Sequence, residues 1–416
     1  MTRIGFWSAA KAYQDRIAVV DPSGTEVTYG ELQDRANQLV HALRAMGVRS
    51  GDSMAILLPN SIEFVASMLA ASQAGLYYTP INHDLDASEI AYILGNSDAK
   101  AFIAHEQFAD KARAAVVEAD LPQLRTLAVG TIEGFVEFAD VVDQQPAIEP
   151  DGRTAGSPMA YTWGASGRLE SARRPLSGMT PETQDALTSP MNMLAVFGLS
   201  QAVRNAHLCV SPLYHDAPRE YALFALQLGH TVILTTSFDA EQFLTLVEKH
   251  RVTSTQMAPI QFYRLLKLAE TTRERYDVSS LRVICHTAGP CPADVKRRIM
   301  TWFGSAMYES HSSGDAVGGI LITPTEALDR LQTGGRPTLH GATVKILDEL
   351  GNELPSGQPD AVYPAQPQTR RPTSAPRTDR RPRPAVTSVA RWAVAPARRK
   401  AGTCVVCRGE ESRTEA

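Results

Sequence analysis

The sequence predicts an α/β protein in which helices cover both faces of parallel β-sheets. Within residues 5–360, short apolar runs rich in β-branched residues alternate with longer amphipathic runs, and glycines or prolines separate the two kinds. Segments rich in Gly, Ser, Thr and His follow several of the apolar runs directly. In open α/β sheets, ligands settle beyond the carboxyl ends of the strands, so these segments are the expected binding loops.

The first part of the chain contains a helix with recognisable ends. Thr28 and Glu31 have the spacing of a capping box, in which each side chain bonds to the backbone N–H of the other residue. The apolar residues that follow fall on one helical face, and Gly47 ends the helix. The elements expected next are a strand over residues 53–58, a helix that begins at Ser61 and stops at Gly75, and a strand over residues 77–81.

The same alternation continues through the middle of the chain. Strands are expected over residues 207–213, 231–236, 254–259, 281–286 and 306–310. Helices are expected up to residue 228, over residues 239–250, after residue 259 and over residues 292–303. This order favours parallel sheets, because parallel strands need a crossover helix between them.

Length and composition agree with a protein of several lobes. A chain of 416 residues exceeds what one hydrophobic core usually supports. Its hydrophobic residues, 44% of the total, are enough to fill two or three such cores. No apolar run approaches the roughly 18 residues of a membrane span, and the start lacks the apolar stretch of a secretion signal. Five scattered cysteines give no disulfide framework, so a cytoplasmic location is expected. Cys404 and Cys407 form a lone CxxC without the second pair that a structural zinc site needs.

The last part of the chain differs in composition from the rest. Residues 361–416 contain 12 Lys and Arg against 4 Asp and Glu, a balance of +8, so residues 1–360 carry −12 of the total of −4. Seven prolines and few large apolar residues predict a disordered tail. Clustered arginines are typical of nucleic-acid-binding arms. We favour a second interpretation, a shifted reading frame in a G+C-rich gene, over such an arm.

The stretch YTWGASGRLES at residues 161–171 has the composition of a phosphate-binding loop. Thr162 and Ser166 offer hydroxyls, while Gly164 and Gly167 permit positive φ and close approach of backbone N–H groups to an anion. Ordinary turns use the same residues, so the loop alone is a weak signal.

Further segments strengthen the interpretation as a phosphate-binding loop. Their residues and their order along the chain resemble the adenylate-forming (AMP-binding) superfamily, and in particular its fatty acyl-CoA synthetases. In that family the loop reads close to YTSGTTGxPKG. Trp163, Leu169, Glu170 and Ser171 stand here where the family has Ser, Pro, Lys and Gly. Other matching segments lie in the family's order at residues 27–61, 77–82, 211–215 (SPLYH), 286–292 (HTAGPCP), 308–319 (YESHSSGDAVGG), 334–337 (GGRP) and 344–359.

The resemblance implies the large N-terminal domain of adenylate-forming enzymes over residues 5–359, with two helix-covered sheets and a distorted β-barrel. The family continues with a ribose-binding TGD loop and a small C-terminal domain that carries a catalytic lysine. No segment after Pro359 resembles either of them. We therefore expect a truncated and degenerate member of the family.

The resemblance also assigns roles to individual residues. The implied nucleotide-binding residues are Thr162, Gly164, Ser166, Gly167, Ala288, Gly289, Pro290, His311 and Gly314. The implied catalytic residues are His215, which would orient the carboxylate or gate its path, and Asp315, at the position of the family's Mg²⁺-holding glutamate. His311 replaces the aromatic residue that stacks on adenine. A zinc site of His286, His311 and Asp315 is not expected, because their spacing fits no helix-borne zinc pattern.

The implied chemistry has two steps. A carboxylate attacks the α-phosphate of ATP to give an acyl-AMP and pyrophosphate, and the thiol of coenzyme A then displaces AMP. Such transfer needs positioning and charge neutralisation. Glu170 instead places a negative charge at the lysine position. A like charge at about 4 Å costs roughly 4 kcal/mol at an effective dielectric of 20, and the lost charged hydrogen bond costs roughly 1.5–3 kcal/mol. Arg168, Arg173 and Arg174 either compensate or are solvated surface charges.

Two interpretations of different class stay open. The first is an ATP-dependent acid–thiol ligase acting on a small carboxylic acid, most simply a fatty acid, with impaired or absent turnover. The second is a non-catalytic remnant that binds a nucleotide or an acyl group. The sequence does not indicate the oligomeric state, and a nucleic-acid partner is a weaker third interpretation.

Overall fold

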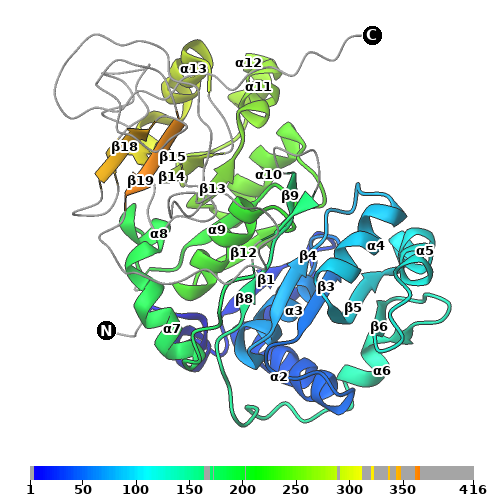
Figure 1. The fold of residues 1–416 in the computed structure, drawn as a ribbon. Helices are drawn as coiled ribbons and strands as arrows, with labels where there is room; N and C mark the ends of the chain where they lie inside the picture. Colours follow the sequence, from blue (N-terminus) through cyan, green and yellow to red (C-terminus); the bar gives the residue numbers. More distant parts are fainter. Residues whose placement is uncertain are drawn as a thin grey trace, which may run out of the picture. The chain divides into compact units, whose positions relative to one another are not determined.

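The computed structural model describes residues 4–163, 169–171, 173–201, 203–287, 291–311, 320–322, 336–337, 343–347 and 361–365. The chain divides into two compact units, the first made of Met1–Phe238 and His250–Thr255, the second of Asp239–Lys249 and Gln256–Ala416. Figure 1 labels their helices and strands. None of the helices in the described ranges is both long enough and apolar enough to span a bilayer.

The first unit contains a parallel six-stranded sheet. Its strands, in spatial order, are β7 (Val136–Glu137), β6 (Arg125–Val129), β5 (Ala99–His105), β3 (Ser53–Leu57), β4 (Tyr77–Pro80) and β8 (Ser157–Pro158). All five strand pairs in it are parallel. The expected parallel arrangement is therefore confirmed for this part of the chain.

Helices cover this sheet because its strands are apolar on both faces. Every residue of β3 is buried, which a half-solvated sheet would not allow. Helices α4 (Ala87–Asn96) and α5 (Ala109–Ala119) form one core cluster with Ala55 and Leu57 of β3 (Figure 1). A short helix, α6 (Phe138–Val142), follows β7.

Two further helices of this unit begin and end where local chemistry dictates. In α2 (Tyr29–Ala45), Thr28 and Glu31 form both halves of the predicted capping box. In α3 (Ile62–Ala74), the Ser61 side chain accepts from Phe64 N–H, and Gly75 ends the helix with a φ of 69°. A Cβ at Gly75 would lie 2.3 Å from Thr154 Oγ1, so both the conformation and the space demand glycine.

A second sheet of the first unit joins segments far apart in sequence. Its strands are β11 (Ala206–Cys209), β12 (Thr231–Leu234), β1 (Ile17–Val20) and β2 (Glu26–Thr28). The β11–β12 and β12–β1 pairs are parallel, and β1–β2 is antiparallel. The helices of this part are α1 (Phe6–Ala12), α7 (Pro181–Thr188), α8 (Met193–Val196) and α9 (Asp216–Gln227).

A single buried amide, Asn60, connects the two sheets of the first unit. It lies just after β3, and its Nδ2 donates to the Ser211 carbonyl at 3.0 Å and to the Thr235 carbonyl at 2.9 Å. Its Oδ1 accepts from Leu213 N–H at 2.7 Å. These acceptors and this donor lie in the loops that follow β11 and β12, so Asn60 fixes the carboxyl ends of three strands together.

A carboxyl group joins three helices of the same unit. Asp185 of α7 accepts from Phe6 N–H at the start of α1 and from the Gln227 side chain at the end of α9, both at 3.2 Å. Burial raises the pKa of Asp185 to about 7, against the lowering influence of these two donors.

The strands of the second unit pair in a mixed arrangement. Strands β14 (Val283–His286) and β15 (Met307–His311) are parallel, and β16 (Ile320–Ile322) and β17 (Arg336–Pro337) continue antiparallel. Its helices are α10 (Ala240–His250), α11 (Pro259–Lys267), α12 (Glu270–Arg273) and α13 (Ala293–Phe303). Strand β13 (Ser254–Met257) carries the chain from the first unit into the second.

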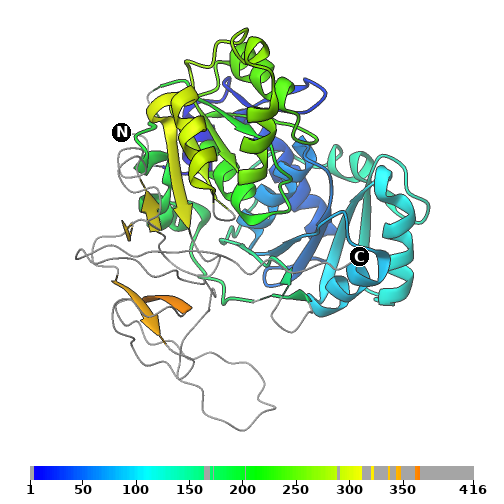
Figure 2. The ribbon, with the colours of Figure 1, turned by 90° about the horizontal axis from the view of Figure 1, so that it is seen from above.

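Most expected elements are present, and most of the strands are shorter than expected. The run expected at residues 207–213 ends as a strand at Cys209, because Asn60 captures the backbone after it. Within residues 361–416, for which disorder is expected, Ala361–Ala365 form β19 and pair antiparallel with β18 (Thr343–Leu347), as Figure 2 shows. The rest of that segment lies outside the described residues.

We predict that Asn60→Leu lowers the free energy of unfolding by about 2–5 kcal/mol, since it leaves one N–H and two carbonyls without their partner. Urea unfolding would measure the change. Asn82→Leu is the matched control, because Asn82 accepts only a local bond from Asp84 N–H, and its loss should cost less than about 1 kcal/mol. Equal costs for the two variants would contradict the connecting role.

We predict that Asp185 makes stability fall as pH rises from about 4 to 7. Its folded pKa is about 7 against an ordinary 3.8, so the folded state binds more protons in this window. Asp185→Asn should remove this slope and leave the protein more stable than the wild type at pH 8, by more than about 1 kcal/mol. Urea unfolding at several pH values tests this, with the exposed Asp151→Asn as control. An unchanged slope in Asp185→Asn would refute it.

Candidate functional site

The stretch predicted to bind phosphate contains a short β-hairpin. Strands β9 (Thr162–Trp163) and β10 (Leu169–Glu170) pair antiparallel, with Thr162 opposite Glu170 and Trp163 opposite Leu169. Gly164, Ser166 and Gly167, the predicted phosphate contacts, lie between them and outside the described residues. Glu170, which occupies the lysine position, is exposed at the base of the hairpin.

The base of this hairpin is anchored in the core of the first unit. Leu169 is 7% exposed and belongs to the cluster formed by β3, β5, α4 and α5. Tyr92 of α4 donates to the Leu169 carbonyl at 3.3 Å, and Tyr161 donates to Asn96 Oδ1 at 2.6 Å. Burial raises the pKa of Tyr161 well above its ordinary value, which keeps it a neutral donor. Leu169 therefore stabilises by apolar packing the position where the resembling family has proline.

The basic residues after the hairpin attach the chain to β4. The Arg173 guanidinium stacks over the Tyr77 ring at 4.4 Å and donates to the Gly51 carbonyl at 2.6 Å. Tyr77 donates in turn to the Arg174 carbonyl at 2.5 Å. Arg173 is exposed and also packs on β4, so these contacts do not decide between its two interpretations.

His215, the predicted carboxylate-handling residue, lies at the N-cap of α9. Its ring contacts Tyr214, with centroids 4.4 Å apart. The side chain is exposed to solvent. Desolvation by its packed neighbours lowers the pKa of His215, and the nearby Asp216 carboxylate opposes this effect. A lowered pKa favours the neutral imidazole, which can accept a hydrogen bond or a proton.

A buried arginine holds the loop that carries His215. Arg219 is 5% exposed and forms an ion pair with Asp216. It also donates to the Leu213 carbonyl at 3.4 Å and the Tyr214 carbonyl at 3.2 Å. The loop is therefore fixed from α9 by Arg219 and from β3 by Asn60.

Side chains that the sequence did not single out complete the surroundings of His215. Tyr214 donates to Asp84 at 3.5 Å, and His83 lies 3.3 Å from the same carboxylate. The His83 ring stacks on Phe108 with centroids 5.1 Å apart. His83 and Asp84 follow β4, so their place after the strand predicted over residues 77–81 was the signal that could have identified them.

The remaining predicted site residues belong to the second unit, and most lie outside the described residues. Ala288, Gly289 and Pro290 follow β14, and Gly314 and Asp315 follow β15. His311 is the last residue of β15. At the end of β14, Thr287 N–H donates to the Met257 carbonyl at 3.2 Å, and Thr287 Oγ1 accepts from Gln256 at 2.6 Å.

An ionic cluster that the sequence did not reveal lies behind these two strand ends. Lys296 of α13 and Glu309 of β15 form a buried ion pair. His286 Nδ1 lies 3.9 Å from the other carboxylate oxygen, and the His286 ring stacks on Phe262. Burial raises the pKa of Cys291, at the foot of α13, to about 12, so this thiol is no nucleophile at neutral pH.

Mg²⁺ is the metal that the resemblance implies. The described residues include no group of three or more His, Cys, Asp or Glu side chains that could hold a metal ion. Asp315 lies outside them, as do Cys404 and Cys407.

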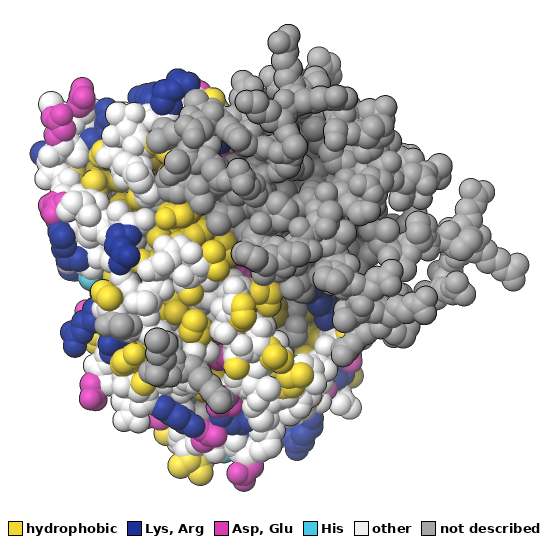
Figure 3. All heavy atoms as spheres, turned by 90° about the vertical axis from the view of Figure 1, so that its left-hand side faces the viewer, with side chains coloured by type: hydrophobic (Ala, Val, Ile, Leu, Met, Phe, Trp, Pro, Cys, Tyr) yellow, Lys and Arg dark blue, Asp and Glu magenta, His cyan; other side chains and the backbone are white. Residues whose placement is uncertain are grey.

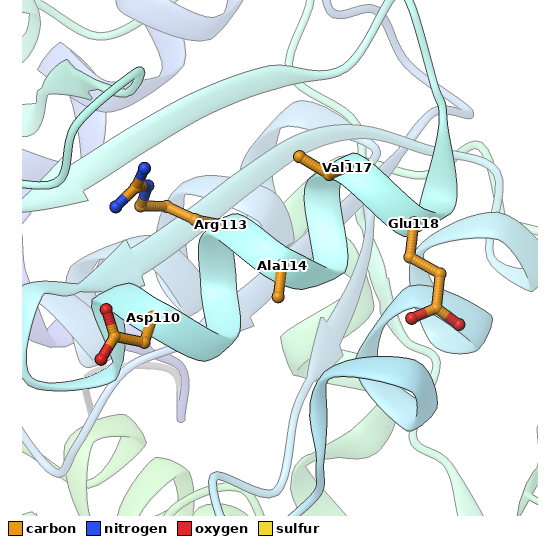
Figure 4. Close-up of a pocket in the computed structure, with 5 residues that line it drawn as sticks. All are labelled: Asp110, Arg113, Ala114, Val117 and Glu118. Carbon is orange, nitrogen blue, oxygen red and sulfur yellow. The ribbon is translucent and has the colours of Figure 1, made fainter.

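Two features of the described surface include none of the predicted site residues. A pocket of about 460 Å³ lies along α5, lined among the described residues by Asp110, Arg113, Ala114, Val117 and Glu118 (Figure 4). Arg113 is engaged with Glu133 at 2.7 Å. On the described part of the face in Figure 3, Lys and Arg are interspersed with acidic and apolar side chains, without the continuous basic stripe of a nucleic-acid footprint.

Comparison with curated proteins finds relatives that are CoA ligases. The chain is 28% identical to a feruloyl-CoA synthase of Amycolatopsis sp over 367 residues, which cover 88% of this chain and 70% of the relative. It is 29% identical to a medium/long-chain-fatty-acid–CoA/3-oxocholest-4-en-26-oate–CoA ligase of Mycolicibacterium smegmatis, covering 84% of this chain and 66% of the relative. The chain thus spans about two thirds of the length of these relatives.

Solved structures share the fold over nearly the whole match. The inhibitor-bound N-terminal domain of FACL13 from Mycobacterium tuberculosis superposes with a TM-score of 0.72 at 23% identity, over 88% of this chain and 89% of that one. The family described as "AMP-binding enzyme" matches residues 6–371, which extends beyond the expected boundary at 359. The chain therefore belongs to the AMP-binding enzyme family and has the α/β fold of the N-terminal domain of adenylate-forming enzymes.

Proposed function

We propose that this chain binds ATP and activates a carboxylic acid as its acyl-AMP, for transfer to coenzyme A. The observation that carries the proposal is the hairpin of β9 and β10, which is anchored in the core on both sides of the Gly- and Ser-containing segment that resembles the family's phosphate loop. Backbone N–H groups of a segment with this composition can bind phosphate oxygens. The family relationship supports the same role.

The proposed carboxylate site is the cluster around His215. A neutral imidazole at the start of α9 can donate to or accept from a carboxylic acid, and Arg219 and Asn60 hold its loop. The apolar rings of Tyr214 and Phe108 flank the cluster. We propose a fatty acid as the substrate, in line with the relative that acts on medium and long chains. An aryl acid is the second candidate, because another relative is a feruloyl-CoA synthase.

We also propose that Glu170 weakens ATP binding. Its carboxylate stands opposite Thr162 at the base of the hairpin, where the resembling family places a lysine. The opposite charge at this position repels a triphosphate and supplies no donor to it. This feature favours, as a second candidate function, a protein that binds nucleotide or acyl groups with little or no turnover.

We predict carboxylate-dependent exchange of pyrophosphate into ATP, at a rate above the protein-free control, with fatty acids of about 8 to 16 carbons preferred over ferulate. Exchange is the direct measure of acyl-AMP formation and does not require coenzyme A. His215→Ala should lower the rate at least tenfold, through loss of carboxylate orientation. If the exchange rate equals that of the protein-free control for every acid tested, while ATP binding is measurable, the protein is not a ligase and the non-catalytic function holds instead.

We predict that Glu170→Lys raises the affinity for ATP at least tenfold, because it removes a repulsive charge and restores a charged donor. Isothermal titration calorimetry with ATP measures the change. Glu26→Lys makes the same charge change at an exposed residue of β2 and should leave the affinity unchanged. Equal affinities of the wild type and Glu170→Lys would show that nucleotide phosphates do not bind at this hairpin.

A further inference from the structure

Helix α11 of the second unit has an exposed face that combines apolar and basic side chains. Its members are spaced i, i+3, i+4 and i+7, so they lie on one side of the helix, and they are Ile260, Tyr263, Arg264 and Lys267. Ile260 is 59% exposed, Tyr263 is 42% exposed, and both basic residues are exposed as well. The sequence of α11 includes no Asp or Glu. We call these four residues the α11 face.

The opposite side of the same helix is buried, which fixes the helix in its unit. Phe262 and Leu265 are fully buried, and Leu266 is 8% exposed. The Phe262 ring stacks on His286 of β14 with centroids 5.7 Å apart, and α11 packs against α13. Because α11 is held from this side, the α11 face can meet a partner without any change in the fold.

The helices beside α11 extend this surface. Arg297 and Arg298 of α13 are exposed. At the end of α13 the rings of Trp302 and Phe303, both half-buried, stack with centroids 4.5 Å apart. The Arg273 guanidinium of α12 lies 5.2 Å from the centroid of the Trp302 ring. Figure 1 shows α11, α12 and α13 as neighbours, so basic and aromatic groups gather on this part of the second unit.

The charge of this part of the chain is opposite to that of the residues around it in sequence. Residues 259–303 contain 8 Lys and Arg against 4 Asp and Glu, a balance of +4. Residues 1–360 as a whole carry −12, so the others in that range carry −16. A locally positive surface on an acidic protein turns that surface toward an anionic partner, because the acidic remainder is repelled.

The exposed apolar side chains next to these cations indicate the class of partner. An anionic bilayer attracts Lys and Arg that lie close to it, and its interface also accepts aliphatic and aromatic side chains. A tyrosine ring suits such an interface, since its body is apolar and its hydroxyl is polar. A nucleic acid would neutralise the charges, but it offers no apolar phase to Ile260.

We propose that the α11 face binds the surface of anionic lipid bilayers, with Ile260 and Tyr263 in the interface and Arg264 and Lys267 against the lipid phosphates. The contact is peripheral, since no helix in the described ranges is suited to cross a bilayer. Lipid binding does not require that the chain activate an acid, so it stands or fails independently of the proposed function.

The test is co-sedimentation of the full chain with large unilamellar vesicles, either of phosphatidylcholine alone or of phosphatidylcholine with about one third phosphatidylglycerol. Binding to the anionic vesicles should be at least about tenfold stronger than to the neutral ones, and it should weaken as ionic strength rises from about 0.05 to 0.5 M. Ile260→Asn/Lys267→Gln removes one apolar side chain and one positive charge, and should weaken binding to the anionic vesicles at least about tenfold.

The matched control is Val117→Asn/Arg113→Gln in α5 of the first unit, which makes the equivalent changes at an exposed valine and an exposed arginine. Vesicle binding by this control should equal that of the wild type. Circular dichroism and the melting temperature check that each variant is folded. Where Ile260→Asn/Lys267→Gln is not folded, Lys267→Glu serves instead, with at least about fivefold weaker binding expected from the reversed charge.

A wild-type protein that does not bind anionic vesicles, or that binds neutral vesicles equally well, would overturn the proposal. A folded α11 variant that binds anionic vesicles as the wild type does would overturn it too. Binding of single-stranded RNA that the same variant loses, without vesicle binding by the wild type, would assign the α11 face to a nucleic acid instead.

Discussion

The architecture of the first unit depends on one buried side-chain amide. Asn60 satisfies two carbonyls and one N–H from loops that lie more than 150 positions away in sequence. Each of these backbone groups would otherwise be buried without a partner, which costs free energy comparable to a lost hydrogen bond. The contact forces the ends of β3, β11 and β12 to the same place. The loop with His215 begins there, so the position of the proposed carboxylate site follows from a packing requirement.

Tertiary contacts also anchor the strands that flank the other candidate segments. At the hairpin, Leu169 and two tyrosines anchor β9 and β10. At β14 and β15, His286 and Glu309 are paired in register, and Glu309 forms a buried ion pair with Lys296. In α/β folds the chemistry resides in loops that a rigid sheet positions, and most candidate residues of this chain follow its strands.

The sequence predicts best what local interactions determine. The capping box of Thr28 and Glu31, the Ser61 cap and the Gly75 stop involve residues a few positions apart, so their spacing is legible. The family of the chain could also be read, because several short motifs keep their order. The Lys296–Glu309 pair, the stacking of Arg173 on Tyr77 and the contacts of Asn60 could not be predicted, because they join distant positions through tertiary packing. Strand ends were misjudged for the same reason, as at Cys209. The candidate phosphate, adenine and Asp315 contacts stay predictions, since all of these residues except Thr162 and the backbone of His311 lie outside the described ones.

The anchored base of the hairpin has a consequence for how such a protein persists in a cell. Chaperones and proteases sense exposed apolar surface and the fraction of unfolded chain, and neither depends on the charge of one exposed side chain. Because Leu169 and its neighbours carry the folding contribution of the hairpin, a change of charge at the exposed Glu170 should leave the unfolded fraction unchanged. Cellular abundance of this protein would therefore report how well it folds and not how fast it turns over.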